Sequence, residues 1–141
     1  MNQFELVADY LPESVQGIIA VIGLPATEKL IRAYGGTVIK FSRAYACFDR
    51  LREVLGQDDA IKLQQYVGGS EIYIPRCETA LRMLRDQRIY ADFCQLTEQD
   101  KLSGRAAMVQ ICTTHQVCDR TAWRAVNYFQ AGGKSPQASL F

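Results

Sequence analysis

Residues 62–76 read KLQQYVGGSEIYIPR, and residues 29–43, which lie 33 positions earlier, read KLIRAYGGTVIKFSR. The two stretches share a Lys-Leu pair, a Gly-Gly pair and a final arginine at the same offset. The similarity extends upstream, where apolar residues and a glycine correspond: Ile18, Val21, Ile22 and Gly23 with Leu51, Val54, Leu55 and Gly56. So many matches at one offset predict an internal repeat. We name its two copies the first segment, residues 12–43, and the second segment, residues 45–76.

Each segment begins with two predicted helices. Apolar residues recur at helical spacing and end at Gly23 in the first segment and at Gly56 in the second. Glycine is common just past the end of a helix. A second helix is predicted over residues 26–34 and over residues 58–66, and each stops at Gly-Gly. The same helical hairpin is therefore expected twice.

Each segment ends in a predicted strand. Residues 38–41 and 72–74 are rich in β-branched and aromatic side chains, and Pro75 closes the second run. A single strand would leave its backbone donors and acceptors unpaired. The two copies can therefore supply each other with a pairing partner, strand 37–41 with strand 70–74.

The composition is that of an ordinary globular chain. Its 141 residues are 48% apolar and 22% charged, which suits one core with a small appended unit. A net charge of +1 gives the whole molecule no strong attraction to nucleic acid or to an anionic membrane. From residue 104 onward basic residues exceed acidic ones, since Arg105, Arg120, Arg124 and Lys134 stand against Asp119. This modest excess fits either a DNA-binding surface or a solvated face.

Neither an exported nor a membrane protein is expected. Residues 1–10 already contain Glu5 and Asp9, and no apolar run approaches the roughly 18 residues that a membrane span requires. The five cysteines are odd in number and scattered through apolar runs, which favours reduced, buried thiols. We expect a soluble cytoplasmic protein.

Residues 106–129 favour a helix-turn-helix. Apolar side chains at helical spacing are expected to line the contact between two short helices: Ala107, Ile111, Cys112, Val117, Ala122, Ala125, Val126 and Phe129. Cys118 or Asp119 begins the second helix, where a carboxylate offsets the helix dipole. The side chains left pointing outward are Arg120, Thr121, Trp123, Arg124 and Asn127. Arginine can pair with guanine and asparagine with adenine, so this face is a candidate DNA-binding surface.

No catalytic or metal-binding motif stands out. Cys112, His115 and Cys118 are ligand types that zinc accepts, but they span a helix end and a turn and have no evident fourth ligand. His115 is the only histidine, and nothing in the sequence places a nucleophile and a carboxylate beside it. The Gly-Gly pairs lack the Gly-Lys-Ser/Thr ending of a phosphate-binding loop. We therefore predict no enzymatic activity, no metal and no cofactor.

Two stretches carry a family resemblance. Residues 68–76, GGSEIYIPR, and residues 84–93, LRDQRIYADF, resemble the Gly-Gly to Pro-Arg and Arg-Asp to Asp-Phe segments of the Mor middle-operon activators of Mu-like phages. The resemblance resumes at residues 110–126 and at the closing residues 137–141. It covers roughly residues 45–141, and its most specific part is the Gly-Gly to Pro-Arg stretch.

The sequence departs from the family pattern in two places. Gln116 stands at the turn position that favours glycine, so it must adopt a left-handed backbone or distort the turn. Gln95 replaces a family glycine, and residues 96–105 form an insertion before the first helix of the helix-turn-helix. That insertion is expected to reposition the motif.

The resemblance implies a DNA-binding transcription activator. Members pair through N-terminal helices and through the strand, which forms a ribbon across a dimer axis, and each chain carries one helix-turn-helix. By this resemblance Gly68, Gly69 and Tyr73 would lie near the DNA backbone, and Arg76 joins the predicted DNA-binding residues. Two arrangements stay open. Either the first segment imitates a second subunit in a monomer, or the chain dimerises and presents two helix-turn-helix motifs to a palindromic site.

We therefore predict a mainly α-helical protein with a short two-stranded antiparallel β ribbon and a C-terminal helix-turn-helix. Residues 1–93 would form the helical and ribbon domain, residues 94–130 the helix-turn-helix, and residues 131–141 a flexible tail that could contact RNA polymerase. The predicted function is regulation of transcription, and activation in the first place, for a phage, prophage or mobile element, by binding double-stranded DNA. The alternative is a protein-interaction module on the same scaffold that no longer binds DNA.

Overall fold

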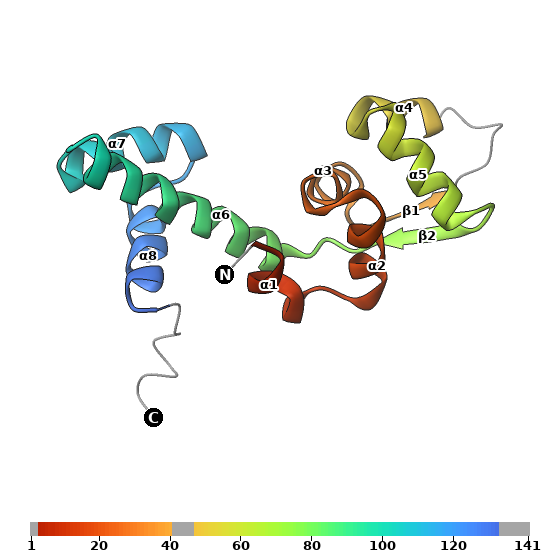
Figure 1. Cartoon of the computed structure of the whole chain (residues 1–141), viewed down its shortest axis with the longest axis horizontal. Helices are drawn as coiled ribbons and strands as arrows, with labels where there is room; N and C mark the ends of the chain where they lie inside the picture. The colour runs from red at the N-terminus through yellow and green to blue at the C-terminus, as the bar shows by residue number, and fades with distance from the viewer. Residues whose placement is uncertain (1–2, 41–46, 133–141) are drawn as a thin grey trace. The chain divides into compact units, whose positions relative to one another are not determined.

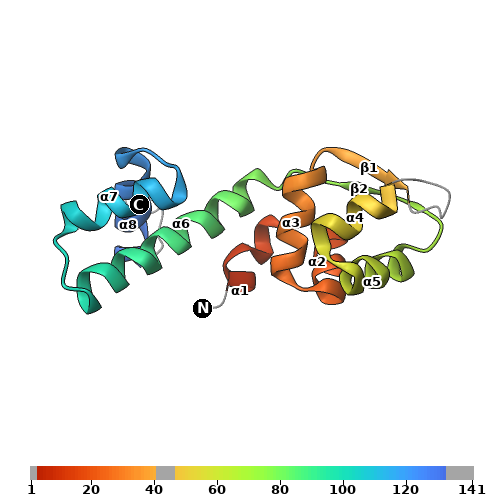
Figure 2. The same cartoon turned by 90° about the horizontal axis from the view of Figure 1, so that it is seen from above.

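The computed structural model describes residues 3–40 and 47–132, and the chain divides into two compact units at the boundary between Leu81 and Arg82 (Figures 1 and 2). The described residues are mainly helical and contain one two-stranded antiparallel sheet, so the predicted mainly α-helical class with a short antiparallel ribbon is confirmed. The predicted polymerase contact falls on a tail whose residues 133–141 lie outside the described ranges. In the described part of the chain, none of the helices combines the length and the apolar character that a membrane crossing requires.

The first unit presents one order of elements twice, namely helix, helix and strand. After α1, Gln3–Val7, and a short 3-10 turn, Ala8–Tyr10, this order runs through α2, Glu13–Ile22, α3, Leu24–Tyr34, and β1, Thr37–Lys40. It recurs in α4, Cys47–Leu55, α5, Gln57–Val67, and β2, Glu71–Ile74. Helix α3 starts two residues earlier than predicted, because a proline such as Pro25 is tolerated in the first turn of a helix. The order in each segment is as expected, and a duplication as its origin stays a prediction.

The two helical hairpins turn at glycines with almost the same backbone angles. Gly23 has φ 86° and ψ 163°, and Gly56 has φ 88° and ψ 162°. Side chains other than glycine rarely adopt such angles. The N–H of Gly23 donates to the carbonyl of Ile19 at 2.7 Å, and that of Gly56 to the carbonyl of Arg52 at 2.8 Å. The predicted helix ends at these two glycines are therefore confirmed.

Strands β1 and β2 pair antiparallel within the one chain and lie side by side in both views (Figures 1 and 2). Ile39 faces Ile72 in this register. Because side chains alternate along a strand, Ile39 is buried on one face of the ribbon, whereas Val38 and Tyr73 are exposed opposite each other on the other. Strand β2 begins at Glu71, one residue later than predicted, where its pairing with β1 starts. Residue 41 of the predicted first strand lies outside the described residues.

The core of the first unit comes from both segments. Its buried apolar side chains lie on α1 to α5, on both strands, at Leu11 between α1 and α2 and at Ala80 near the start of Glu78–Cys94: Val7, Leu11, Val15, Ile18, Ala26, Leu30, Ile31, Ile39, Leu51, Leu55, Ala60, Leu63, Ile74 and Ala80. Helix α2 packs against α5 as well as against α3, and α3 packs against α4. Complete burial of one large apolar side chain is worth roughly 1.5–3 kcal/mol. Each segment therefore depends on the other for much of its stability.

The second unit contains most of one long helix, followed by two shorter helices joined by a turn. Helix α6, Glu78–Cys94, crosses the boundary between the units and leads into a π-helical turn, Gln95–Gln99. Helix α7, Gly104–His115, and helix α8, Asp119–Gln130, follow. The predicted insertion, residues 96–105, therefore folds as most of the π-helical turn, the connection that leads to α7 and the first two residues of α7. The order of α7, turn and α8 matches the predicted elements, and their assignment as a helix-turn-helix remains a proposal.

Candidate nucleic-acid interface

One apolar core holds α6, α7 and α8 together in the second unit. Its buried side chains are Ile89 and Phe93 from α6, Ala107, Met108 and Ile111 from α7, and Ala122, Ala125 and Val126 from α8. Half-buried neighbours include Cys112 and Val117, both of which the sequence placed at this contact. The face of α8 that points inward is therefore fixed by packing. Its opposite face is left for solvent or for a partner.

The start of α7 is defined by a cap and by a glycine. Ser103 precedes the helix, and its hydroxyl accepts a hydrogen bond of 3.2 Å from the N–H of Ala106. A Cβ on Gly104 would lie 3.4 Å from Cη2 of Trp123, so a larger residue would press on the indole ring. Trp123 also meets Phe93 edge to face, with ring centroids 5.7 Å apart. The beginning of α7 and the middle of α8 are thus packed against each other.

Gln116 takes the left-handed backbone conformation that the turn requires. Its φ is 54° and its ψ is 49°, and its N–H donates to the carbonyl of Cys112. The N–H of Val117 donates to the same carbonyl at 3.2 Å. Of the two predicted outcomes, a left-handed residue or a distorted turn, the structure has the first. The strain of holding a residue with a Cβ in this region is about 1 kcal/mol or somewhat more.

Cys118 begins α8 at the surface. It is the N-cap residue and is exposed, so the expectation of buried thiols is wrong here, because a cap lies outside the packed face of its helix. Its sulfur lies 3.3 Å from the hydroxyl of Thr121, and this hydrogen bond lowers the pKa of the Cys118 thiol. Across the turn, burial raises the pKa of the Cys112 thiol. Asp119 occupies the first turn of α8, where a carboxylate suits the helix dipole.

His115 pairs with a carboxylate that the sequence reasoning did not connect to it. Its Nε2 lies 2.7 Å from Oδ2 of Asp92, which links the last turn of α7 to α6. The two residues are 23 positions apart, so no local pattern reveals the contact. Over residues 3–40 and 47–132, no group of three or more histidine, cysteine or acidic side chains could hold a metal ion. The pair therefore fixes His115, the last residue of α7 before the turn, to α6.

The outer face of α8 carries three exposed polar side chains at helical spacing. Arg120, Arg124 and Asn127 are exposed and lie four and three residues apart, which places them on one face of the helix. Within the described residues, no ion pair involves either arginine. Their guanidinium groups are therefore free to bind an external acceptor. The sequence predicted this grouping.

Two further residues predicted on this face have different surroundings. Thr121 is half-buried, and its hydroxyl lies against Cys118. Trp123 is half-buried in the apolar core, where it contacts Phe93. An indole on a short helix can serve either a core or a surface, and here the neighbouring glycine at position 104 makes room for it in the core.

The other four predicted DNA-binding residues belong to the first unit. Gly68 and Gly69 follow α5 and have open space where a Cβ would stand, and Tyr73 is exposed on β2. Arg76 is also exposed, but its side chain lies over the first Gly-Gly pair, since a Cβ on Gly36 would be 2.7 Å from its Nε. Sequence reasoning missed this packing, because the two residues are distant in the chain.

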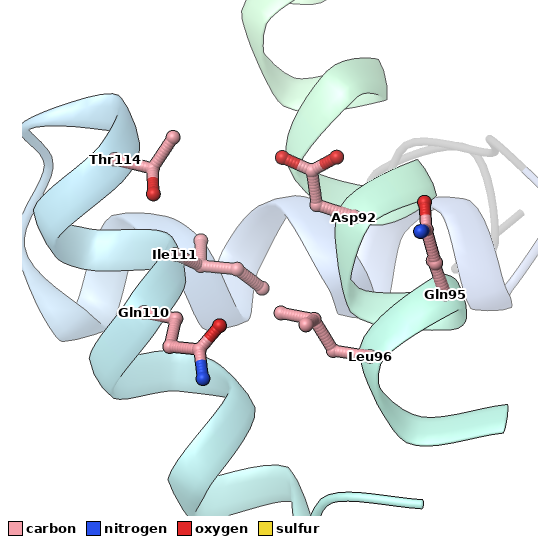
Figure 3. Close-up of a pocket in the computed structure, with 6 residues that line it drawn as sticks. All are labelled: Asp92, Gln95, Leu96, Gln110, Ile111 and Thr114. Atoms are coloured by element: carbon pink, nitrogen blue, oxygen red, sulfur yellow. The ribbon is translucent and has the colours of Figure 1, made fainter. Parts of the chain in front are cut away.

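A small hollow lies between the end of α6 and α7 (Figure 3). Its volume is about 190 Å³, and its lining is mostly polar: Asp92, Gln95, Leu96, Gln110, Ile111 and Thr114. Figure 3 shows the first three side chains facing the last three across the gap. The lining offers hydrogen-bonding groups and no nucleophile paired with a base, so it points to no reaction.

Comparison with known proteins gives one match. The model of the Mor transcription activator family matches residues 37–133, which is more than half of the chain. The match includes both strands, α4 to α8 and all nine predicted DNA-binding residues, and it leaves most of the first segment outside. Neither the comparison with curated proteins nor that with solved structures finds a match.

Proposed function

The chain belongs to the Mor transcription activator family, and from this premise we propose that it recognises specific DNA sequences through a helix-turn-helix made of α7, the turn and α8. Membership by itself carries the general role, which is transcription activation with DNA binding, in a family that is non-enzymatic in general. The sequence-specific contact and the residues that make it are the proposal.

The exposed face of α8 is the observation that carries this proposal. Arg120, Arg124 and Asn127 share that face, while Ala122, Ala125 and Val126 fix the opposite face in the core. A helix held in this way can enter the major groove with its orientation already set. An arginine can donate two hydrogen bonds to guanine, and an asparagine can pair with adenine. We therefore assign base contacts to these three residues.

The remaining predicted residues receive supporting roles. Thr121 lies beside the N-terminus of α8, where a hydroxyl can reach a phosphate, and Trp123 holds the helix in the core. The N–H of Gly68 donates to the carbonyl of Gln64 at 2.8 Å, so we assign the Gly68-Gly69 turn a steric role: without side chains it lets a phosphate approach the backbone closely. Exposed Tyr73 and Arg76 are the side chains of the first unit that we expect near the DNA backbone.

The wider setting that we propose is a cytoplasmic regulator of a phage, prophage or related mobile element. An activator must contact the transcription machinery, and RNA polymerase is the partner that this role requires. The C-terminal tail remains our predicted contact for it, and its residues 133–141 are outside the described part of the chain.

A selection experiment tests the proposal. Double-stranded sites are enriched from a random pool on the purified protein, and affinity is then measured with each base pair of the selected site replaced in turn. We expect Arg124→Ala to lose about 1–3 kcal/mol of discrimination at one base pair. The matched control is Arg50→Ala, which removes an exposed arginine from α4 and should leave the base preference unchanged.

Two results would contradict this assignment. An equal loss of affinity on every sequence would make Arg124 a phosphate contact, which carries no sequence information. No binding even at low salt, where phosphate contacts are strongest, would instead favour the alternative of a protein-interaction module on a Mor-like scaffold.

A further inference from the structure

The ribbon of the first unit has the symmetry of a pair of identical strands. When a strand pairs antiparallel with its own copy across a twofold axis, the residue at the axis faces the same residue of the copy. Here Ile39 faces Ile72, and these residues are 33 positions apart, which is the offset of the sequence repeat. Strands β1 and β2 are therefore centred on corresponding residues.

The contacts between the helices follow the same twofold symmetry. Helix α2 corresponds to α4 and α3 to α5, because their positions match at the same offset. In the structure α2 packs against α5, and α3 packs against α4. Exchanging the two segments turns one of these contacts into the other. This reciprocity is the mark of an interface between two equivalent subunits, in which the same patch is used on both sides.

The surface that a second copy would cover is already buried in one chain. Ile18 and Leu51 correspond to each other, as do Leu30 and Leu63, and none of the four exposes more than 1% of its surface. These side chains lie on α2 to α5, the helices that exchange contacts between the segments. These four positions, at which a second copy would pack, are therefore already covered within the one chain.

The chain continues differently after the strands of the two segments. Helix α6 comes after β2 and leads to α7 and α8, whereas the chain after β1 leads to α4 and the second segment. One pair of segments thus has one α8. Two identical subunits would have two copies of α8.

We infer that the first segment is a built-in second subunit, so that the protein acts as a monomer and recognises a single, non-palindromic DNA site with one α8. Dimeric helix-turn-helix proteins read two half-sites related by symmetry. A monomer with one such motif has no reason to prefer an inverted repeat. The nature of the DNA site rests on the proposed function, whereas the monomeric state does not.

A disulfide across the ribbon tests the built-in subunit without DNA. Val38 and Tyr73 face each other and are 57% and 55% exposed, so cysteines at both positions should leave the core intact. Opposed residues of an antiparallel pair have Cα atoms about 4.5–5.5 Å apart, which a disulfide can span. The full-length chain with Val38→Cys and Tyr73→Cys is oxidised, and its mass is measured under non-reducing conditions.

The expected product is a monomer with an internal disulfide. A matched control is Val38→Cys with Glu71→Cys, in which the second thiol sits diagonally at about 7–8 Å and should link poorly. The unsubstituted chain controls for the five native cysteines. Disulfide-linked dimers in the first variant but not in the controls would overturn the inference, because the ribbon would then form between chains. A dimeric mass of the unsubstituted protein by light scattering would overturn it as well.

The DNA part is tested with the selected sites themselves. We expect sites without an inverted repeat and one protein molecule per duplex, measured as the mass of the complex. Two molecules on a palindrome would overturn the inference while leaving the proposed function intact. A protein that is monomeric, forms the internal disulfide and binds no DNA would overturn the proposed function and keep the built-in subunit.

Discussion

The two segments of the first unit fold alike at their helical hairpins and differently at their Gly-Gly turns. Gly23 and Gly56 have φ values that differ by only 2°, at 86° and 88°. At the Gly-Gly turn, Gly36 has a φ of 84° and lies under Arg76, whereas Gly69 has no positive φ and, among residues 3–40 and 47–132, no neighbour where a Cβ would stand. Similar sequences therefore gave one pair of matching turns and one pair of different turns.

The difference shows how far a local sequence pattern extends. A hairpin turn is set mainly by the packing of its own two helices, so both copies reach the same backbone angles. The Gly-Gly turn depends on what another part of the chain places over it, and in the first segment that is Arg76. The corresponding arginine of the first segment, Arg43, lies outside the described residues.

The largest expected effect is the loss of stability when a buried leucine is replaced at corresponding positions of the two segments. Leu30→Ala and Leu63→Ala each remove a fully buried leucine from corresponding positions of α3 and α5. Such a cavity lowers the free energy of unfolding by about 2–5 kcal/mol, and we expect similar losses at both sites in urea denaturation. Ile61→Ala, at an exposed position of α5, should cost much less. A large loss of stability at only one of the two leucines would show that the two segments are not packed alike.

A smaller effect on stability is expected when alanine replaces a glycine of the Gly-Gly turns, where the two segments differ. Gly36→Ala should lower the free energy of unfolding by about 1–2 kcal/mol, because alanine is strained at a positive φ. Gly69→Ala, which meets open space, should change it by about 0.5 kcal/mol or less. Repeating Gly36→Ala in a chain with Arg76→Ala separates backbone strain, which remains, from contact with the arginine, which is lost. Equal costs at the two glycines would show that the turns are alike in solution.

The smallest effect extends the comparison to the second unit, where a left-handed turn is built without glycine. Gln116→Gly should raise the free energy of unfolding by up to about 1 kcal/mol, since glycine relieves the strain at φ 54°. Part of this gain is offset because glycine is more flexible in the unfolded chain. Thr114→Gly, within α7, is the control and should lower stability by about 0.2–0.5 kcal/mol, because glycine is a somewhat poorer helix former than threonine. A loss of stability in Gln116→Gly would mean that the glutamine side chain itself supports the turn.

Much of the candidate site follows from helical periodicity. The alternation in residues 106–129 separates Ala107, Ile111 and Val126, which are buried, from Arg120 and Arg124, which are exposed. Apolar side chains are buried where the helices pack, so their spacing in the sequence predicts which face of each helix points inward. Periodicity also places Trp123 outward, whereas the structure packs it against Phe93. The space at Gly104 that admits the indole comes from another helix and has no local signal.

The order of helices and strands, the hairpin turns at Gly23 and Gly56 and the polar face of α8 were determined by the sequence itself, because each depends on residues close together in the chain. Only the tertiary structure decided the register that sets Ile39 against Ile72, the pairing of His115 with Asp92 and the place of Arg76 over Gly36. These contacts join residues 23 to 40 positions apart. These contacts depend on how whole helices and strands pack together, so the local sequence around each residue does not predict them.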